Sequence, residues 1–339
     1  MKSRGLFTGR SGMSTKTAEG MTCLYLRTLS FEQVCCTLGI IYNDRVLSKK
    51  TLIKNCEYVA DSLPSLWEVS AWLKPKRSGY YALDGTWVTY RGEDRVLLIL
   101  YDVETLDVVS YCIALEEEEE SYRRLMDPVR EEIGTPKGFF CDGDTGLLAM
   151  LKRDYVNVPI QLCVFHKYSR AGQVLPFVRP RTEIDKQMKA LVEKVLFAPT
   201  KADALSSLEE LRLYAADHAK KRKVQTILAL LEHNFDLLLT HFDNPDMHSR
   251  YNNTLEGFNA VIKRKTCLMR GFKKEQNVDR WIKLILLDWR FHSLHASFDK
   301  ARRGKSPLQL GGVTLPKLWN WINYVTIKYP KKKVAKSRS

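Results

Sequence analysis

The chain has 339 residues, of which 45% are hydrophobic and 27% charged, so it can form a core of its own and is not disordered throughout. No apolar run approaches the roughly 18 residues of a membrane-spanning helix. The first residues also lack the apolar segment of a secretory signal. The 8 cysteines form no CxxC pair, which favours reduced thiols in a cytosol or nucleus over a disulfide framework.

The charge is distributed very unevenly along the chain. There are 54 Lys and Arg residues against 39 Asp and Glu, a formal net charge of +15. Residues 257–339 hold 20 basic and 4 acidic side chains, a net charge of +16, whereas the first 256 residues hold 34 and 35, a net charge of −1. Such asymmetry indicates a polyanionic partner, with nucleic acid favoured over an anionic membrane surface. The alternative is a basic tail that only aids solubility.

The N-terminal part predicts helices without an obvious chemistry. Residues 1–22 show no periodicity and predict a flexible basic arm, and residues 23–75 predict a helical domain. Ser30 and Ser48 are suitable N-caps for two successive helices, a layout similar to a helix-turn-helix, although the connector is longer than the usual turn. Plain helical packing explains this pattern equally well. If the second helix reads DNA, the contacts come from its first residues, Ser48, Lys49 and Lys50.

Residues 76–168 predict the α/β part of the chain, after a linker at 74–79. Apolar segments separated by turn residues indicate an antiparallel meander of three strands, followed by helix, strand, helix and strand. The five strands are expected at 79–90, 95–104, 107–116, 137–144 and 159–167. Five consecutive glutamates, residues 116–120, precede an amphipathic helix. Acids stabilise a first helical turn, so we expect no catalytic role for them.

The remainder of the chain is predicted to be mostly helical. Residues 169–246 show helical periodicity throughout and predict an all-helical insertion into the α/β domain. Residues 247–298 are expected to return to that domain and include a long helix. Residues 299–339 predict a basic C-terminal region whose last residues, from 328 onward, are disordered.

Three acidic residues stand where a fold would concentrate them. Asp84 lies inside an apolar strand, Asp142 ends the fourth strand, and Glu256 lies near the start of a helix. If the first and fourth strands are parallel neighbours, Asp84 and Asp142 lie close together, and Glu256 can complete the cluster. Three such carboxylates suit two hard cations such as Mg²⁺, which together promote attack on a phosphodiester. Asp144 is the rival of Asp142 as the second ligand.

Other side chains have two interpretations. Cys163 and His166 form a CxxH pair, which is half of a zinc site, but the sequence offers no second pair to complete it. His166 either contacts a scissile phosphate or orients a ligand, or else the pair only shapes the sheet edge. Phosphate contacts are predicted for basic residues of the last quarter, namely Lys263, Arg264, Lys265, Arg270, Lys331, Lys332 and Lys333.

Four strings in order sharpen this interpretation: LDGTW (83–87), CDGDTGL (141–147), QLCVFH (161–166) and NNTLEGFN (252–259). They resemble the sequence blocks of the IS256 and Mutator-like transposases over roughly residues 80–295. The order of strands and acids is similar to the ribonuclease-H-like fold of DDE transposases. Two features depart from the family pattern: the region before residue 76 is shorter than usual, and the second block carries the additional acid Asp144.

The resemblance implies a specific activity. It assigns Asp84, Asp142 and Glu256 as a catalytic triad that binds two Mg²⁺ (or Mn²⁺) ions, and it favours a functional CxxH pair. The implied reaction is cleavage and joining of double-stranded DNA at the terminal inverted repeats of a mobile element, by a homodimer on the DNA. The expected location is the cytoplasm or nucleoid of a prokaryote, or the nucleus of a eukaryote. The alternatives are an inactive transposase-derived DNA-binding protein and a ribonuclease-H-like nuclease.

Overall fold

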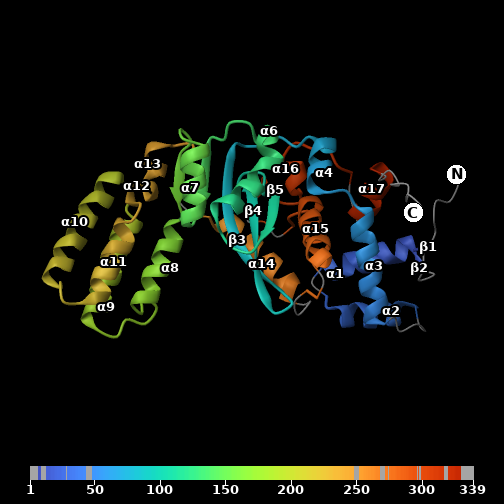
Figure 1. The fold of residues 1–339 in the computed structure, drawn as a ribbon, viewed down its shortest axis with the longest axis horizontal. Helices are drawn as coiled ribbons and strands as arrows, with labels where there is room; N and C mark the ends of the chain where they lie inside the picture. Colours follow the sequence, from blue (N-terminus) through green and yellow to red (C-terminus); the bar gives the residue numbers. More distant parts are fainter. Residues whose placement is uncertain are drawn as a thin grey trace.

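The computed structural model describes residues 7–8, 13–27, 29–42, 48–247, 252–267, 272–273, 275–295, 297, 299–316 and 320–329. Among the predicted DNA contacts, Arg270, Lys331, Lys332 and Lys333 lie outside these ranges. The protein is a mixed α/β structure in which one five-stranded sheet separates two groups of helices (Figure 1). No helix among the described residues is long and apolar enough to cross a membrane.

The sheet has the order β5-β4-β3-β6-β7. Its strands are β3 (Tyr80–Tyr90), β4 (Glu93–Asp102), β5 (Asp107–Ala114), β6 (Gly138–Cys141) and β7 (Ile160–Leu162). β3, β4 and β5 form an antiparallel meander, and β6 pairs in parallel with both β3 and β7. The predicted meander and the predicted parallel neighbourhood of the first and fourth strands are therefore confirmed. A separate two-stranded sheet joins β1 (Phe7–Thr8) to β2 (Met13–Ser14).

Both faces of the sheet are covered, which explains the continuous apolar sequence of β4. Leu97, Ile99 and Tyr101 point into one hydrophobic core, whereas Leu98 and Leu100 point into the other. A strand buried on both faces cannot alternate apolar and polar residues. The second core is closed by α5 (Glu119–Met126), the 3₁₀ turn η1 (Asp127–Val129), α6 (Arg130–Ile133) and α7 (Thr145–Asp154).

The fifth strand is shorter than predicted. β7 ends at Leu162, and α8 (Val164–Val174) begins where the sequence predicts continued strand up to residue 167. The partner strand β6 ends at Cys141, so β7 has no further ladder to pair with. Cys163 then occupies the N-cap position, and the Lys167 amide donates to the Cys163 carbonyl oxygen at 3.3 Å. His166 therefore lies on a helix, not at the exit of a strand.

The region between β7 and residue 247 is helical, as predicted. Its helices are α8, α9 (Glu183–Leu196), α10 (Lys201–Asp217), α11 (Arg222–Glu232), α12 (Phe235–Leu238) and α13 (Thr240–Asp243). They project from one side of the sheet and form the left end of the molecule in Figure 1. Their apolar side chains continue the second core, so the helices extend that side of the sheet.

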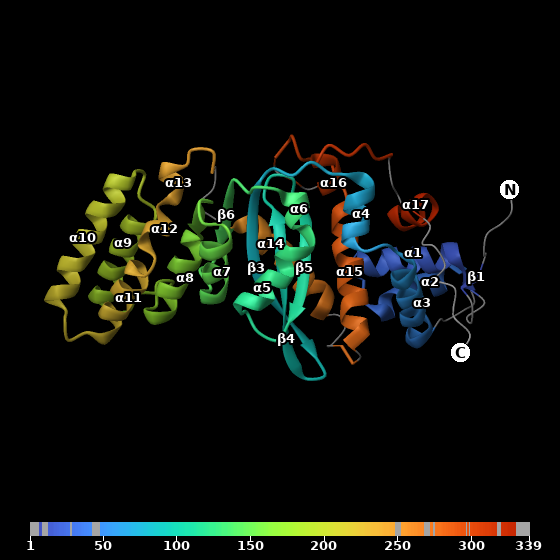
Figure 2. The same cartoon turned by 45° about the horizontal axis from the view of Figure 1, so that its top comes forward.

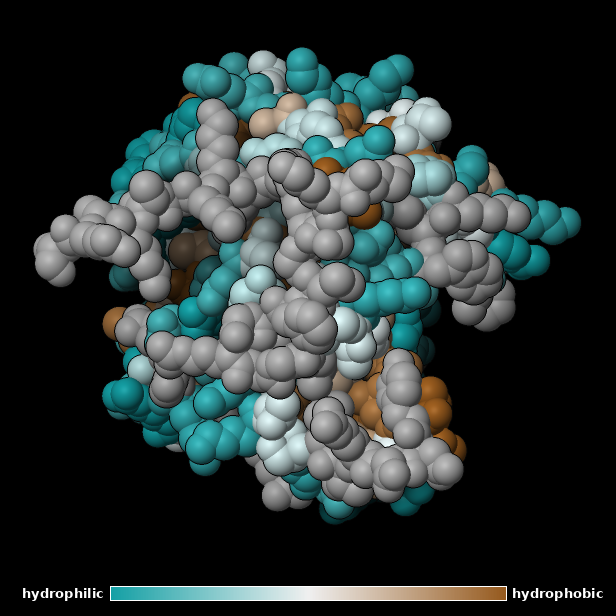
Figure 3. Space-filling view, turned by 90° about the vertical axis from the view of Figure 1, so that its right-hand side faces the viewer, coloured by the Kyte–Doolittle hydropathy of each residue, from teal (hydrophilic) through white to brown (hydrophobic). Residues whose placement is uncertain are grey.

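The N-terminal and C-terminal helices pack on the other face of the sheet and extend from it to the opposite end of the molecule. They are α1 (Thr15–Leu26), α2 (Phe31–Tyr42), α3 (Lys49–Ser62), α4 (Leu66–Leu73), α14 (Asn253–Cys267), α15 (Glu275–Phe291), α16 (Pro307–Leu310) and α17 (Trp321–Lys328). Figure 2 shows α15 between the sheet and the N-terminal helices. All of these helices contribute to the first core, which is continuous with one face of the sheet. Figure 3 looks onto this end, where hydrophilic surface predominates among the described residues.

The structure differs from the predicted N-terminal arm. α1 begins at Thr15, where the Ser14 hydroxyl accepts a hydrogen bond from the Thr17 amide at 3.1 Å. Ala18 and Met21 of this helix are completely buried. Residues 15–22 are therefore helical and packed. A short helix is stabilised mainly by tertiary contacts, which the local sequence does not reveal.

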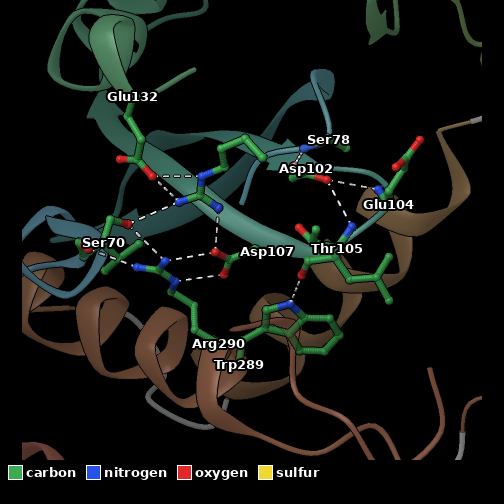
Figure 4. Close-up of polar contacts among 12 residues, drawn as sticks. Ser70, Ser78, Asp102, Glu104, Thr105, Asp107, Glu132, Trp289 and Arg290 are labelled. Atoms are coloured by element: carbon green, nitrogen blue, oxygen red, sulfur yellow. Dashed lines mark hydrogen bonds and ion pairs between the residues drawn. The ribbon is translucent and has the colours of Figure 1, made fainter. Parts of the chain in front are cut away.

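A buried ionic network fastens the N-terminal helices to the sheet (Figure 4). The Arg290 guanidinium donates to Asp107 Oδ1 at 2.8 Å and to Oδ2 at 2.9 Å, and also to Ser70 Oγ at 3.0 Å. Arg77 donates to Asp107 Oδ2 at 2.7 Å and pairs with Glu132. Arg77 belongs to the predicted linker 74–79, yet its side chain is only 6% exposed. The connection between α4 and β3 is therefore held by buried charges.

Candidate functional site

The three predicted acids converge on one cleft. Asp84 is on β3, Asp142 directly follows β6, and Glu256 is in the first turn of α14, and all three line a cleft of about 690 Å³. β3 and β6 pair as far as Ala82 opposite Phe140. Two residues further along each strand, that register brings Asp84 level with Asp142. The parallel pairing therefore positions the two aspartates.

Asp84 is held on both carboxylate oxygens. The Gly85 amide donates to Oδ1 at 2.9 Å, and the Asn259 side-chain amide donates to Oδ2 at 2.8 Å. Asn259 lies one helical turn beyond Glu256, so this bond ties α14 to β3. Burial and the neighbouring Asp142 carboxylate raise the pKa of Asp84 to about 7. A carboxylate with such a pKa gains from a cation that neutralises the cluster.

Asp142 and Asp144 both line the cleft but have different neighbours. Asp144 is the N-cap of α7, and its Oδ1 accepts from the Leu147 amide at 3.0 Å. Asp142 Oδ1 accepts from the Asp144 amide at 3.1 Å, and its Oδ2 pairs with Arg170 of α8 at 3.2 Å. Asp144 therefore has a defined structural role at the start of α7, whereas both carboxylate oxygens of Asp142 accept from groups at the rim of the cleft.

Glu117 is a fifth acid of the cleft, and the sequence interpretation missed it. Glu119 and Glu120 lie in the first turn of α5 as expected, but Glu117 turns into the cleft, next to Gly85. A Cβ atom at Gly85 would lie too close to Glu117 Oε1 and to Val96 Cγ2, so a larger residue there would displace both side chains. Burial, followed by the charges of Asp142 and Asp144, raises the pKa of Glu117. The only sequence signal was its position directly after a strand.

Cys163 and His166 lie beside Glu256. The Cys163 Sγ–Glu256 Oε1 distance is 3.9 Å, and the His166 Nδ1–Glu256 Oε1 distance is 3.5 Å. The Asn252 amide, just before α14, donates to Cys163 Sγ at 3.4 Å. One potential ligand atom from each of Cys163, His166 and Glu256 lies within 4.8 Å of the others. The CxxH pair therefore meets the third acid of the cleft.

The predicted basic contacts fall into two groups. Lys263 and Arg264 are exposed on α14, and Lys263 lines the cleft. Lys265 is only 5% exposed, and its Nζ pairs with Asp288 of α15 at 3.1 Å. The prediction of a phosphate contact for Lys265 is therefore wrong, because this residue lies on the buried face of α14 that also carries Phe258 and Ile262.

At the N-terminal end, the predicted DNA-contacting residues are exposed at the start of α3. Ser48 is the N-cap, and its hydroxyl accepts from the Thr51 amide at 3.2 Å. Lys49 and Lys50 are exposed, and Lys49 pairs with Glu32 of α2 at 2.8 Å. Residues 43–47, which connect α2 to α3, lie outside the described residues.

Comparison with known families places the chain in one of them. A comparison with curated proteins gives no match. The sequence model of the family described as "Transposase, Mutator family" matches residues 6–293. That match includes the whole sheet, the acidic cleft and the helices between β7 and α14. Because it covers well over half of the 339 residues, the chain belongs to the Mutator family of transposases.

Proposed function

We propose that the chain is a DDE transposase that cleaves and joins DNA at the terminal inverted repeats of its mobile element. The observation that carries this proposal is the convergence of Asp84, Asp142 and Glu256 on one cleft from β3, the end of β6 and α14. The strand order, with the two aspartates on adjacent parallel strands, favours a ribonuclease-H-like catalytic core. A helical insertion between the second aspartate and the glutamate fits the same proposal.

The donor atoms of the cleft suit a hard divalent cation. Carboxylate oxygens from Asp84, Asp142 and Glu256 are the ligands that Mg²⁺ and Mn²⁺ prefer. The raised pKa of Asp84 fits this assignment, because a buried carboxylate among other carboxylates lacks a neutralising partner. When bound, two such ions activate a water or a 3′-hydroxyl group and stabilise the leaving oxygen.

Other residues of the cleft have supporting roles in this proposal. Asn259 and the Gly85 amide fix the orientation of Asp84. Lys263 supplies a positive charge at the cleft for the DNA backbone. Arg170 pairs with Asp142 and offsets its negative charge. His166 is also assigned to the active site, because its Nδ1 lies 3.5 Å from Glu256 Oε1.

We propose that α3 contacts the element ends as part of a helix-turn-helix. Its buried residues include Leu52 and Val59, whereas Lys50, Lys54 and Tyr58 share the exposed face at intervals of four residues. A basic, aromatic helix face suits double-stranded DNA. The reaction requires two ends held together, which favours a homodimer on the DNA.

The test is a nicking assay on DNA that carries the element ends. Asp84→Asn, Asp142→Asn and Glu256→Gln should each abolish Mg²⁺-dependent nicking and leave DNA binding intact. Asp144→Asn is the matched control, because an asparagine can still cap α7, and it should remain active. Loss of activity in Asp144→Asn with full activity in Asp142→Asn would move the ligand by two residues. Full activity in Glu256→Gln would refute the triad.

The same assay separates the alternative functions. A wild-type chain that binds end DNA but nicks no substrate in Mg²⁺ or Mn²⁺ would be a transposase-derived DNA-binding protein. A chain that cuts RNA or branched junctions in preference to element ends would be a nuclease. Either result would contradict the proposed reaction.

A further inference from the structure

We propose that Cys163, His166 and Glu256 form a binding site for a borderline-soft divalent cation, Zn²⁺ in particular, next to the carboxylate cleft. These three residues come from the end of β7, the first turn of α8 and the first turn of α14. The site shares Glu256 with the proposed catalytic triad. It differs from the triad in its chemistry, because it contains a sulfur and an imidazole nitrogen.

The distances between the ligand atoms fit a single small ion. Ligands of a tetrahedral zinc, with Zn–S near 2.3 Å and Zn–N or Zn–O near 2.0 Å, lie roughly 3.3–3.8 Å apart. Here Nδ1 of His166 is 3.5 Å from Glu256 Oε1, and Sγ of Cys163 is 3.9 Å from the same oxygen. All three atoms lie within 4.8 Å of one another. Small side-chain rotations are enough to bring them onto one ion.

The polar groups around the cluster also indicate a missing partner. His166 Nδ1 is buried and makes no hydrogen bond within the described part of the chain. Buried polar atoms in native proteins nearly always have a partner, and a cation or a water molecule can supply one here. A thiol at 3.9 Å from a carboxylate oxygen is at best a weak donor. A cation would satisfy the imidazole, the sulfur and the carboxylate oxygen together.

The Cys163 sulfur is buried and held in a fixed position, as the sulfur of a metal ligand would be. Cys163 is only 2% exposed, occupies the N-cap position of α8 and accepts a hydrogen bond from the Asn252 amide at 3.4 Å. This environment selects Zn²⁺ over Mg²⁺, because Mg²⁺ prefers oxygen ligands.

Three protein ligands leave one tetrahedral position for an external group. His166 and Glu256 have side chains that are 30% and 34% exposed, and both line the cleft. The open position therefore faces the cleft, where water or a phosphate oxygen can bind. Because a carboxylate has two oxygens, Glu256 can serve both this ion and a cation held by the aspartates.

The test measures bound metal, independently of DNA cleavage. Protein purified without metal-affinity steps and dialysed against Mg²⁺ should retain about one Zn²⁺ per chain by elemental analysis. Cys163→Ser and His166→Asn should each lower this content at least tenfold. Cys267→Ser is the matched control, since Cys267 is exposed at the end of α14, and Asp84→Asn is the control for the triad. Both controls should retain zinc.

Cobalt substitution identifies the sulfur ligand directly. Co²⁺ added to the metal-free protein should give a thiolate-to-cobalt charge-transfer absorption in the wild type and in Asp84→Asn, but not in Cys163→Ser. If Cys163→Ser does not fold, His166→Asn tests the site, because the His166 side chain is partly exposed and its replacement disturbs the core less. Absence of both stoichiometric zinc and the cobalt band would overturn the proposal. So would retention of zinc in Cys163→Ser and His166→Asn. Zinc in Asp84→Asn, together with lost nicking, would separate this site from the triad.

Discussion

Replacing Arg290 should be among the most destabilising changes in this protein. The Arg290 side chain is completely buried, and Asp107 is 1% exposed. Arg290→Met removes two bonds to Asp107 and the bonds to Ser70 Oγ and the Leu66 carbonyl oxygen. Breaking a buried ion pair by removing one partner costs about 3–5 kcal/mol. Arg77 still pairs with Asp107, so we expect about 3 kcal/mol, the lower end of that range.

The free energy of unfolding is measured by denaturant titration, with Lys194→Met as the control. Lys194 pairs with Glu210 at 3.0 Å, but both side chains are more than half exposed. Exposed pairs contribute about 0–1 kcal/mol, so this variant should be nearly as stable as the wild type. Asp107→Asn combined with Arg290→Met should cost less than the sum of the two single changes, because both disrupt one network. An Arg290→Met loss no larger than the control, or strict additivity, would refute the reasoning.

The stability that this network contributes should depend on pH. Burial alone would raise the pKa of Asp107, but Arg290 and Arg77 hold this pKa below its usual range. A lowered carboxyl pKa contributes stability that is present above the ordinary value near 4 and is lost as the pH falls further. The difference between the wild type and Arg290→Met should therefore be constant from about pH 5 to 8 and shrink below about pH 4.

Three further predictions concern the cleft and the DNA contacts. Burial and Asp142 raise the pKa of Asp84 to about 7, so the charged carboxylate destabilises the folded state. In metal-free buffer, Asp84→Asn should therefore raise the free energy of unfolding at pH 8 but not at pH 4. Equal stability at pH 8 would contradict this. Lys263→Ala should weaken DNA binding at unchanged melting temperature, whereas Lys265→Ala should lower the melting temperature; the reverse pattern would contradict the burial of Lys265. Deleting residues 330–339, which include five basic side chains, should flatten the log–log salt dependence of DNA affinity by at most about 4.5, equally for end and random DNA. Loss of sequence preference on this deletion would argue against base reading by α3.

Much of the sheet was predictable because its determinants are local. Apolar runs separated by turn residues gave the meander, and an aspartate inside an apolar strand is conspicuous. Glu117 escaped notice because its role depends on a close approach to Gly85, which no periodicity encodes. Lys265 could have been recognised, since it continues the spacing of Phe258 and Ile262 on the buried face of α14. The shared core of the N-terminal and C-terminal helices rests on contacts across nearly the whole chain.

Those long-range contacts constrain how the protein can be synthesised. Glu19 of α1 is 3% exposed and accepts hydrogen bonds from Asn320 at 3.2 Å and Asn323 at 3.3 Å, at the start of α17. The two helices are neighbours at the right end of Figure 1, although about 300 residues separate them. On the ribosome, the N-terminal helices emerge long before α15 and α17, so the apolar faces that these helices cover stay exposed until both have been translated. A product that stops after the sheet would lack this cover, and chaperones or proteases should intercept it.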